Sequence, residues 1–321
     1  MSEHLTLDQL RTYQNPYYRN MRIQPTKSIG PLLTAGLVAL PNLLLAQPAA
    51  HYPPGLEGIK AATLPPPGVY LRDYNYFYQA SRANDAQGNQ AAVNPTAFIY
   101  ANVPRLLWIT DVQVLGGYLG LDALVPIQYN HIEIGPANYD SSTFGIGDAF
   151  VEATLSWHLK QADLAIGYGV FAPTGNTAPN EPLPSTRIGL GYWTHMLTAG
   201  ATWYIDTDKK WAISALNRYE FSTEKEDTEK IPGQVYTVEG GLSYAISKGI
   251  DIGPIAYYQQ QVTPDTGSSW SSRSRVVGVG PEISTFFPQW MLGASLRYAY
   301  EVMSQSRLQG QTFTLTITKR F

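Results

Sequence analysis

The C-terminal stretch of the chain constrains its fold more than any other. Residues Gly310 to Phe321 read GQTFTLTITKRF, in which apolar and polar residues alternate as far as Thr318. A period of two is the mark of a β-strand with one apolar and one polar face. The departure is Lys319, whose aliphatic stem can lie along apolar surface near a membrane edge while its amine stays in water. The pattern therefore predicts an amphipathic final strand over 311–321.

An ordinary edge strand of a soluble protein is the alternative interpretation. Terminal strands of soluble domains usually fray or are followed by a polar tail, whereas this one stops at the large apolar side chain of Phe321. An aromatic-ended amphipathic final strand resembles the closing strand and insertion signal of bacterial outer-membrane barrels. That resemblance gives Phe321 the role of an insertion signal and implies the outer-membrane insertion machinery as a partner.

The composition points to the same class of fold. The chain has 321 residues, of which 44% are hydrophobic, and a mean hydropathy of −0.18, too polar for a helical membrane bundle. Only 15% of the residues are charged, against about 25% in ordinary soluble proteins. The 22 tyrosines and 28 glycines suit short strands, tight turns and the aromatic belts of a membrane β-barrel. The absence of cysteine excludes a thiolate nucleophile and a cysteine-based zinc site.

The N-terminus has the pattern of a secretory signal. Arg22 and Lys27 precede an apolar run over 29–46, and small residues follow it. We expect residues 1–50 to be a signal peptide with an extended basic region, and a start at Met21 would give a signal of ordinary length. A membrane-spanning anchor is the alternative, disfavoured because prolines interrupt a run shorter than about 20 clean apolar residues.

The chain after residue 50 is slightly acidic. The signal segment removes four basic and two acidic residues, which leaves 22 − 4 = 18 basic and 25 − 2 = 23 acidic residues, a net charge of −5. It has no basic patch, so nucleic acid is not an expected partner.

Twelve strands are predicted after a segment rich in proline and glycine. That segment, 51–68, shows no strand periodicity, and three consecutive prolines near its end cannot donate to a ladder. The predicted strands occupy 69–80, 95–108, 112–131, 143–158, 162–172, 188–204, 211–222, 234–246, 250–262, 273–286, 290–302 and 311–321.

Long and short connections alternate between these strands. The long, polar ones are 81–94, 132–142, 173–187, 223–233, 263–272 and 303–310, and the short ones are 109–111, 159–161, 205–210, 247–249 and 287–289. Outer-membrane barrels have short periplasmic turns, longer external loops and an even number of strands, whereas a soluble sandwich has no reason to sort its loops. We therefore predict an all-β, transmembrane, up-and-down antiparallel β-barrel of about 12 strands over 69–321, embedded in a lipid bilayer.

The charged parity of each strand is expected to face the lumen, because an Arg or Lys facing lipid at the midplane costs roughly 2–4 kcal/mol. This predicts six acids and two arginines inside, and hence a cation preference, unless the arginines pair with neighbouring acids. Strands 69–80, 95–108 and 211–222 do not sort into two faces, which indicates either a bulge or misplaced boundaries. The lumen-lining candidates are Asp148, Glu152, Arg218, Glu220, Glu239, Glu282, Arg297 and Glu301.

A family resemblance rests on the stretch from Phe144 to Asn176. It holds Gly-Ile-Gly-Asp at 145–148, followed by a strand that ends in Pro-Thr-Gly at 173–175. With the segment Gly55–Tyr70 and the C-terminal aromatic, this resembles the outer-membrane family of meta-pathway phenol-degradation proteins. The resemblance implies a transporter-like barrel linked to the uptake of aromatic compounds, with no catalytic residues to carry over.

No enzyme signature competes with this interpretation. Gly-Ile-Gly-Asp lacks the later glycine and the following helix of a nucleotide-binding loop. His131, His158 and His195 lie on three different predicted strands, and neither a Ser-His-Asp set nor a metal-ligand spacing is present. We expect no catalytic residue, no metal and no cofactor.

The predicted function is passive passage of small solutes, including aromatic or otherwise hydrophobic ones, across the outer membrane of a Gram-negative bacterium. A structural or surface-interaction barrel without transport is the alternative, followed by an outer-membrane hydrolase. We expect a monomer or a small homo-oligomer.

The segment before the first strand is predicted to narrow the pore. A barrel of about eight strands already encloses only side chains, so twelve strands leave space that something must fill. We expect 55–67 to fold into the periplasmic mouth as a plug; a disordered leader is the alternative. The plug candidates are Glu57, Lys60, Leu64 and Pro66.

Overall fold

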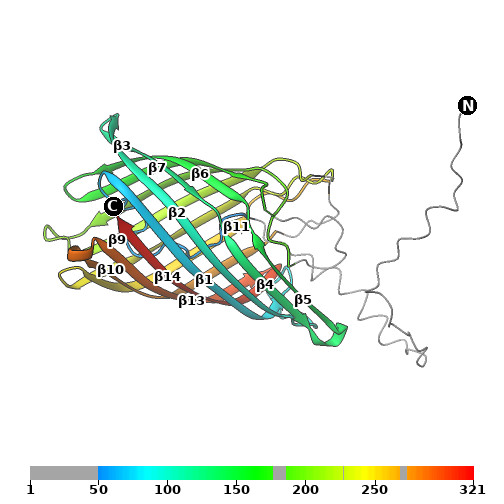
Figure 1. Ribbon diagram of the computed structural model, residues 1–321. Coiled ribbons are helices and arrows are strands. Elements are labelled where there is room, and N and C mark those ends of the chain that lie inside the picture. The colour runs from blue at the N-terminus through cyan, green and yellow to red at the C-terminus, as the bar shows by residue number, and fades with distance from the viewer. Residues whose placement is uncertain (1–49, 176–185, 227, 268–272) are drawn as a thin grey trace, which may run out of the picture. The chain divides into compact units, whose positions relative to one another are not determined.

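The structure, a computed structural model, describes residues 50–175, 186–226, 228–267 and 273–321. These residues form one antiparallel sheet that closes on itself as a barrel (Figure 1). Strand β1 closes it, because it pairs with β2 on one side and β14 on the other: Phe77 lies opposite both Tyr100 and Phe313. The predicted signal peptide lies outside the described residues, apart from Ala50.

Fourteen strand segments make twelve wall strands. β3 and β4 both pair with β2 and are separated only at Val125–Pro126, while β5 and β6 are separated only at Gly147–Asp148. The breaks meet across the wall, where the Gly147 N–H donates to the carbonyl of Pro126 at 2.8 Å. The predicted class, a twelve-stranded antiparallel barrel, is therefore confirmed. The strands are β1 Gly68–Asn84, β2 Thr96–Val114, β3 Gly117–Leu124, β4 Ile127–Ile134, β5 Tyr139–Ile146, β6 Ala149–His158, β7 Ala162–Ala172, β8 Thr194–Tyr204, β9 Trp211–Ser222, β10 Val235–Ser247, β11 Ile250–Gln261, β12 Arg275–Phe287, β13 Leu292–Gln305 and β14 Arg307–Arg320.

The two ends of the barrel differ in their connections. The end that carries residues 115–116, 159–161, 205–210, 248–249 and 288–291 and the C-terminus is called the turn end here, and the opposite end the loop end. At the turn end, the first hairpin turns at Leu115 and Gly116 rather than at the predicted 109–111. Both residues have positive φ, 51° and 78°, as a type I′ hairpin turn requires.

The predicted alternation of long and short connections is wrong at two places on the loop end. β4 and β5 are joined by residues 135–138 alone, and only Ser306 separates β13 from β14. The polar residues of 132–142 continue a paired hairpin that projects from the loop end (Figure 1). Polarity there marks the exposed face of paired strands rather than a loop, while Ile132 and Ile134 are buried on the other face of β4.

Apolar side chains cover the outer face of the wall. Leu106, Ile213 and Val302 are half exposed there, while their strand neighbours point into the barrel. Five tryptophans, Trp108, Trp157, Trp203, Trp211 and Trp290, lie near the turn end, as an interfacial girdle would. Within the described ranges, no helix has the length and apolar character needed to cross a membrane.

The three predicted strands whose residues did not divide into an apolar and a polar face, 69–80, 95–108 and 211–222, pair in a regular register within those bounds. The shift in β1 comes only after Ala80, and that in β2 only after Ile109, so neither a bulge nor a boundary explains the mixed pattern. On β1 and β2 the inner face is largely aromatic and aliphatic instead, with Tyr74, Tyr76 and Val103 buried inside the barrel. The assumption of a uniformly polar lumen failed there.

Candidate functional site

The N-terminal segment Ala50–Pro67 lies inside the barrel. Its larger apolar side chains are buried, among them Tyr52, Leu56 and Ile59. At the loop end, His51 Nδ1 is 2.7 Å from the hydroxyl of Thr194, the first residue of β8. Near the turn end, the Thr63 hydroxyl donates to Asp163 at 3.0 Å. The segment therefore passes along the lumen beyond the mouth that the sequence predicted.

Acids and arginines of β9 to β13 hold the backbone of this segment. Glu239 accepts the N–H of Gly55 at 2.9 Å and the hydroxyl of Tyr52, and it pairs with Arg218. A segment outside the sheet has no ladder to satisfy its peptide groups, so buried side chains must do so.

The neighbouring pair on β12 and β13 acts in the same way. Arg297 forms a two-point contact with Glu282, with distances of 3.0 and 2.9 Å, and donates to the carbonyl of Leu56. Glu282 also accepts the N–H of Ile59 at 2.8 Å. Both members of this charged pair therefore bind the segment through its main chain.

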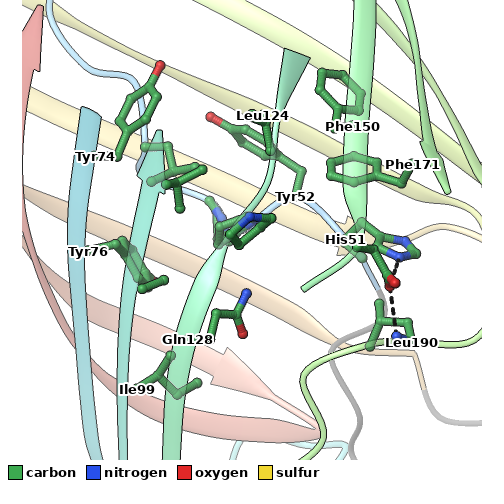
Figure 2. A pocket seen from close by; sticks show the side chains of 18 of the residues that line it. His51, Tyr52, Tyr74, Tyr76, Ile99, Leu124, Gln128, Phe150, Phe171 and Leu190 are labelled. Atoms are coloured by element: carbon green, nitrogen blue, oxygen red, sulfur yellow. Dashed lines mark hydrogen bonds and ion pairs between the residues drawn. The ribbon is translucent and has the colours of Figure 1, made fainter. Parts of the chain in front are cut away.

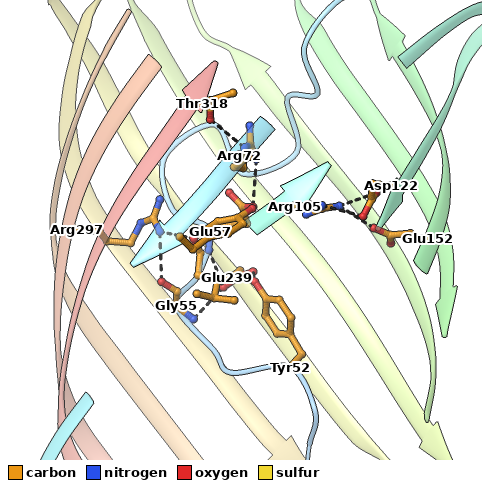
Figure 3. Close-up of polar contacts among 12 residues, drawn as sticks. Tyr52, Gly55, Glu57, Arg72, Arg105, Asp122, Glu152, Glu239, Arg297 and Thr318 are labelled. Carbon is orange, nitrogen blue, oxygen red and sulfur yellow. Dashed lines mark hydrogen bonds and ion pairs between the residues drawn. The ribbon is translucent and has the colours of Figure 1, made fainter. Parts of the chain in front are cut away.

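Glu57 turns from the segment toward the opposite wall (Figure 3). It accepts hydrogen bonds from the Tyr74 hydroxyl at 2.6 Å and from Arg72 at 3.3 Å. Burial by itself disfavours the charged form, but Arg72, Arg297 and the Tyr74 hydroxyl outweigh it and hold the pKa of Glu57 below its usual value. Glu57 is therefore ionised inside the barrel.

The other plug candidates lie nearer the turn end. Lys60 pairs with Asp251 at 2.8 Å. Leu64 packs against a cluster that includes Tyr70, whose hydroxyl donates to the carbonyl of Pro66 at 2.7 Å. These contacts join the segment to the start of the barrel wall.

A cavity of about 240 Å³ remains between the segment and the wall of β1, β2, β6 and β7. Tyr74 and Tyr76 line one side and Phe150 and Phe171 the other, with Tyr52 of the segment between them (Figure 2). Most of the lining is apolar, and further residues such as Ile99, Ala101, Val103, Leu124 and Met196 complete it.

At its loop end the cavity is lined by His51 and by residues just before β8, among them Ile188 and Leu190. The His51 ring stacks on Phe171 with centroids 4.8 Å apart, and its Nε2 is 2.9 Å from Asp148. Asp148 also accepts the N–H groups of Gly175 and Leu190 at 2.8 Å. Burial lowers the pKa of His51, and the nearby Asp148 only partly offsets this.

Backbone contact explains the Pro-Thr-Gly motif at this place. A Cβ on Gly175 would lie 2.8 Å from the Cα of Gly189, so a larger residue would push the two halves of the connection apart. The Gly-x-Gly-Asp motif supplies Asp148, which ties both halves together. Both motifs therefore hold Gly175 and Leu190 together beside the cavity.

All eight lumen candidates lie inside the barrel and are buried: Asp148, Glu152, Arg218, Glu220, Glu239, Glu282, Arg297 and Glu301. Further inward charges were not predicted from the sequence, including Arg72, Arg105 and Arg307. The first two lie on the strands that did not sort, and Arg307 was assigned to a loop. For Arg72, its place on the same face of β1 as Tyr74 and Tyr76 was the available signal.

Most charged side chains in the lumen form ion pairs. The six acids and two arginines expected from the sequence, with a net charge of −4, are therefore only part of the charges inside the barrel. Arg105 contacts Asp122 at 2.8 Å and Glu152 at 3.1 Å. Glu220 is different: one oxygen accepts the His51 N–H at 2.8 Å, and the other has no partner within the described part of the chain. Paired charges weaken the case for cation selectivity.

The three histidines that the sequence analysis considered contact separate partners on different strands. His131 contacts Asp140, and His158 contacts Asp163. His195 contacts the Tyr168 hydroxyl on the outer face. Among the described residues, no cluster of three metal-ligating side chains occurs.

Comparisons with known proteins agree with this architecture. A family model described as "Putative MetA-pathway of phenol degradation" matches residues 80–317. No curated protein sequence matches the chain. The solved COG4313 outer membrane channel from Pseudomonas putida F1 is similar at a TM-score of 0.73 and 16% identity, over 84% of this chain and 100% of that one.

Two further solved structures show weaker similarity. The translocator domain of the autotransporter NalP from Neisseria meningitidis reaches a TM-score of 0.49 at 10% identity, over 82% of this chain and 91% of its own. The CymD monoaromatic hydrocarbon channel reaches 0.38 at 11% identity, over 79% and 89%. At 16% identity, the similarity to the COG4313 channel concerns the fold alone. The TM-scores of the other two structures are too low to support any argument.

Proposed function

The chain belongs to the family described as "Putative MetA-pathway of phenol degradation", and from this membership and the lumen cavity we propose that it is an outer-membrane channel for small, neutral, aromatic or otherwise hydrophobic solutes. A solute would reach the cavity from the loop end and pass along Ala50–Pro67 toward the turn end. The segment narrows this path, so passage requires it to shift.

The aromatic cavity is the observation that carries this proposal. An enclosed apolar cavity of roughly 150 Å³ is known to admit benzene, and this one measures about 240 Å³. Several arginines line it, and Arg105 among them is already paired with Asp122 and Glu152. A neutral ring can enter without breaking an ion pair, whereas an ion would have to compete with one.

Deletion of residues 55–66 tests the plug and the passage together. We expect the deletion variant to fold, to conduct more ions in planar bilayers than the full chain, and to lose selectivity between toluene and small sugars in liposome swelling. A correctly inserted deletion variant with unchanged conductance and uptake would contradict the plug.

A structural barrel without transport is the second candidate, favoured by the dense contacts of the segment with β9 to β13. It predicts that the full chain shows neither conductance nor solute entry while the deletion variant conducts. Toluene entry through the full chain would exclude this candidate.

The location and orientation are tested by labelling. We propose that the loop end faces the cell exterior, since its long connections are polar. A cysteine introduced at Glu226, in the connection between β9 and β10, should react with an impermeant maleimide on intact cells. If labelling requires a permeabilised outer membrane, the orientation is inverted. A cysteine at Asp208, in a turn-end connection, is the control and should stay unlabelled.

A further inference from the structure

A polar cluster lies on the outer face of β1 and β2. Asp73 and Asn75 alternate along β1 with Tyr74 and Tyr76, which line the lumen cavity. They therefore point outward, and so does Asn102, which lies opposite Asn75 on β2. All three are partly exposed. Asp73, Asn75 and Asn102 are called the outer polar cluster below.

Apolar side chains surround this cluster. Ile317 lies opposite Asp73 on β14, and Ile127 lies opposite Asn102 on β4. Leu71 precedes the cluster and Phe77 follows it along β1. The cluster is thus inside the apolar band of the wall, where lipid chains offer neither donors nor acceptors.

Internal hydrogen bonds satisfy most of the cluster. The Asn102 amide donates to both carboxylate oxygens of Asp73, at 2.9 and 3.0 Å, and the Asn75 amide donates to Asp73 at 2.8 Å. The Asn75 oxygen accepts the Tyr100 hydroxyl at 2.9 Å. The carboxylate is therefore covered by amides of its own chain.

Two hydrogen-bonding groups of the outer polar cluster lack a partner among the residues that the structure describes. One N–H of the Asn75 amide and the amide oxygen of Asn102 have no partner in the described ranges. One is a donor and the other an acceptor, and both belong to residues at the same level of the sheet.

We propose that a second copy of this chain binds to the β1–β2 face through the outer polar cluster. A two-fold axis along the membrane normal keeps equal residues at equal depth. The free N–H of Asn75 in each copy then donates to the amide oxygen of Asn102 in the other copy, which gives two equal hydrogen bonds across the interface. Polar side chains that lipid leaves unsatisfied associate membrane segments in this way.

The charge distribution favours an identical copy over a basic partner. Asp73 already accepts three hydrogen bonds from its own chain, so no bare carboxylate awaits a cation, and two copies meet through neutral amides. The apolar residues around the cluster supply the packing. This inference does not depend on the proposed solute.

Cross-linking tests the proposal, because the chain has no native cysteine. Leu106→Cys introduces a thiol on the outer face of β2, at a side chain 55% exposed, and Ile213→Cys on β9 is the matched control at 53%. In native membranes we expect oxidation to give a band of twice the chain mass at least fivefold stronger for Leu106→Cys. Equal cross-linking at both positions would overturn the proposal, as would a product that contains a different protein.

A substitution in the cluster separates the amide pair from general packing. Asn102→Leu in the Leu106→Cys background should reduce the dimer band at least tenfold, while Asn217→Leu, an outward amide on β9, should leave it unchanged. A dimer that persists in Asn102→Leu overturns the proposal. If Asn102→Leu does not fold, native mass spectrometry of the unaltered protein in nanodiscs decides, and a purely monomeric spectrum contradicts the dimer.

Discussion

The two inner walls of this barrel treat the enclosed segment differently. The wall of β9 to β13 presents charged pairs, and the segment binds to it through main-chain groups of Gly55, Leu56 and Ile59. The wall of β1, β2, β6 and β7 presents mainly rings and aliphatic chains, and there the cavity stays open. One wall holds the segment, and the other leaves room beside it.

The difference teaches where a non-ladder segment can be anchored inside a barrel. Its peptide groups need partners once they are removed from water, and an unpaired one costs about 1–3 kcal/mol. Carboxylates and guanidinium groups supply those partners, whereas aromatic rings cannot. The polar wall therefore fixes the position of the segment, and the apolar wall receives a ligand.

The largest expected effect comes from breaking the polar wall at its centre. Glu239→Ala leaves Arg218 buried without its ion-pair partner and removes the acceptor for Gly55 and Tyr52. Breaking a buried pair in this way typically costs about 3–5 kcal/mol. We expect the free energy of unfolding in urea to fall by a similar amount. We also expect the ion conductance in planar bilayers to rise.

The double variant Arg218→Met/Glu239→Leu is the control, because it removes both charges together. It should recover part of the lost stability while the conductance stays high. If the single variant unfolds like the unaltered protein, the polar wall does not hold the segment.

Filling the apolar wall should change passage more than stability. Ala101 is buried on the cavity side of β2, so Ala101→Phe occupies part of the cavity, at a packing cost of about 1–3 kcal/mol. We expect toluene entry to fall several-fold in liposome assays. Ala215→Phe, on the outer face of β9, should change neither quantity. If toluene enters through Ala101→Phe as fast as through the unaltered protein, the cavity is not part of the solute path.

Acid pH should loosen the loop end of the segment. The folded-state pKa of His51 lies below its free value of 6.5, so the docked form resists a proton that the released form accepts. The stability of docking is full above pH 6.5 and declines as the pH falls below it. Glu57, whose pKa is also lowered, adds to this loss below about its free value of 4.5.

Conductance measured from pH 7.5 to pH 5 checks this expectation. It should rise as the pH falls, and His51→Phe should flatten the rise above pH 5. A conductance that is constant over this range would show that His51 does not control docking.

The smallest effect is expected at the turn end, where the ion pair of Lys60 and Asp251 is partly exposed to water. Such pairs contribute about 0.2–1 kcal/mol. Lys60→Met should therefore lower the unfolding free energy by less than Glu239→Ala does. If the two variants are equally destabilised, the anchoring of the segment is not concentrated on Glu239.

The sequence predicted the barrel because periodicity and turn residues are local properties. The final strand illustrates this, since Phe313, Leu315 and Ile317 all alternate toward the outer face. Inward charges on regular strands, such as Glu239 and Arg297, followed from parity for the same reason.

The cavity was not predicted, because it depends on which wall faces the segment. Tyr74 and Tyr76 look like outward residues when the lumen is assumed to be polar, and Arg72, which shares their face of β1, then looks misplaced. Only the three-dimensional structure, in which β1 pairs with both β2 and β14, shows that the aromatic residues of this wall face the lumen and that Asp73 faces outward. The path of residues 50–67 is equally non-local, since His51 and Thr194 are far apart in sequence.

The direct connection between Pro67 and β1 has a consequence for assembly. β1 both continues the enclosed segment and forms the seam with β14. Insertion of residues 50–67 into an already closed barrel would be slow. We therefore expect this segment to bind the inner wall before β1 pairs with β14. Weakening Glu239 should then delay the appearance of the heat-resistant folded form during refolding into lipid, whereas substitutions on the outer face should not. The last hydrogen bonds of the wall would thus form around an occupied interior.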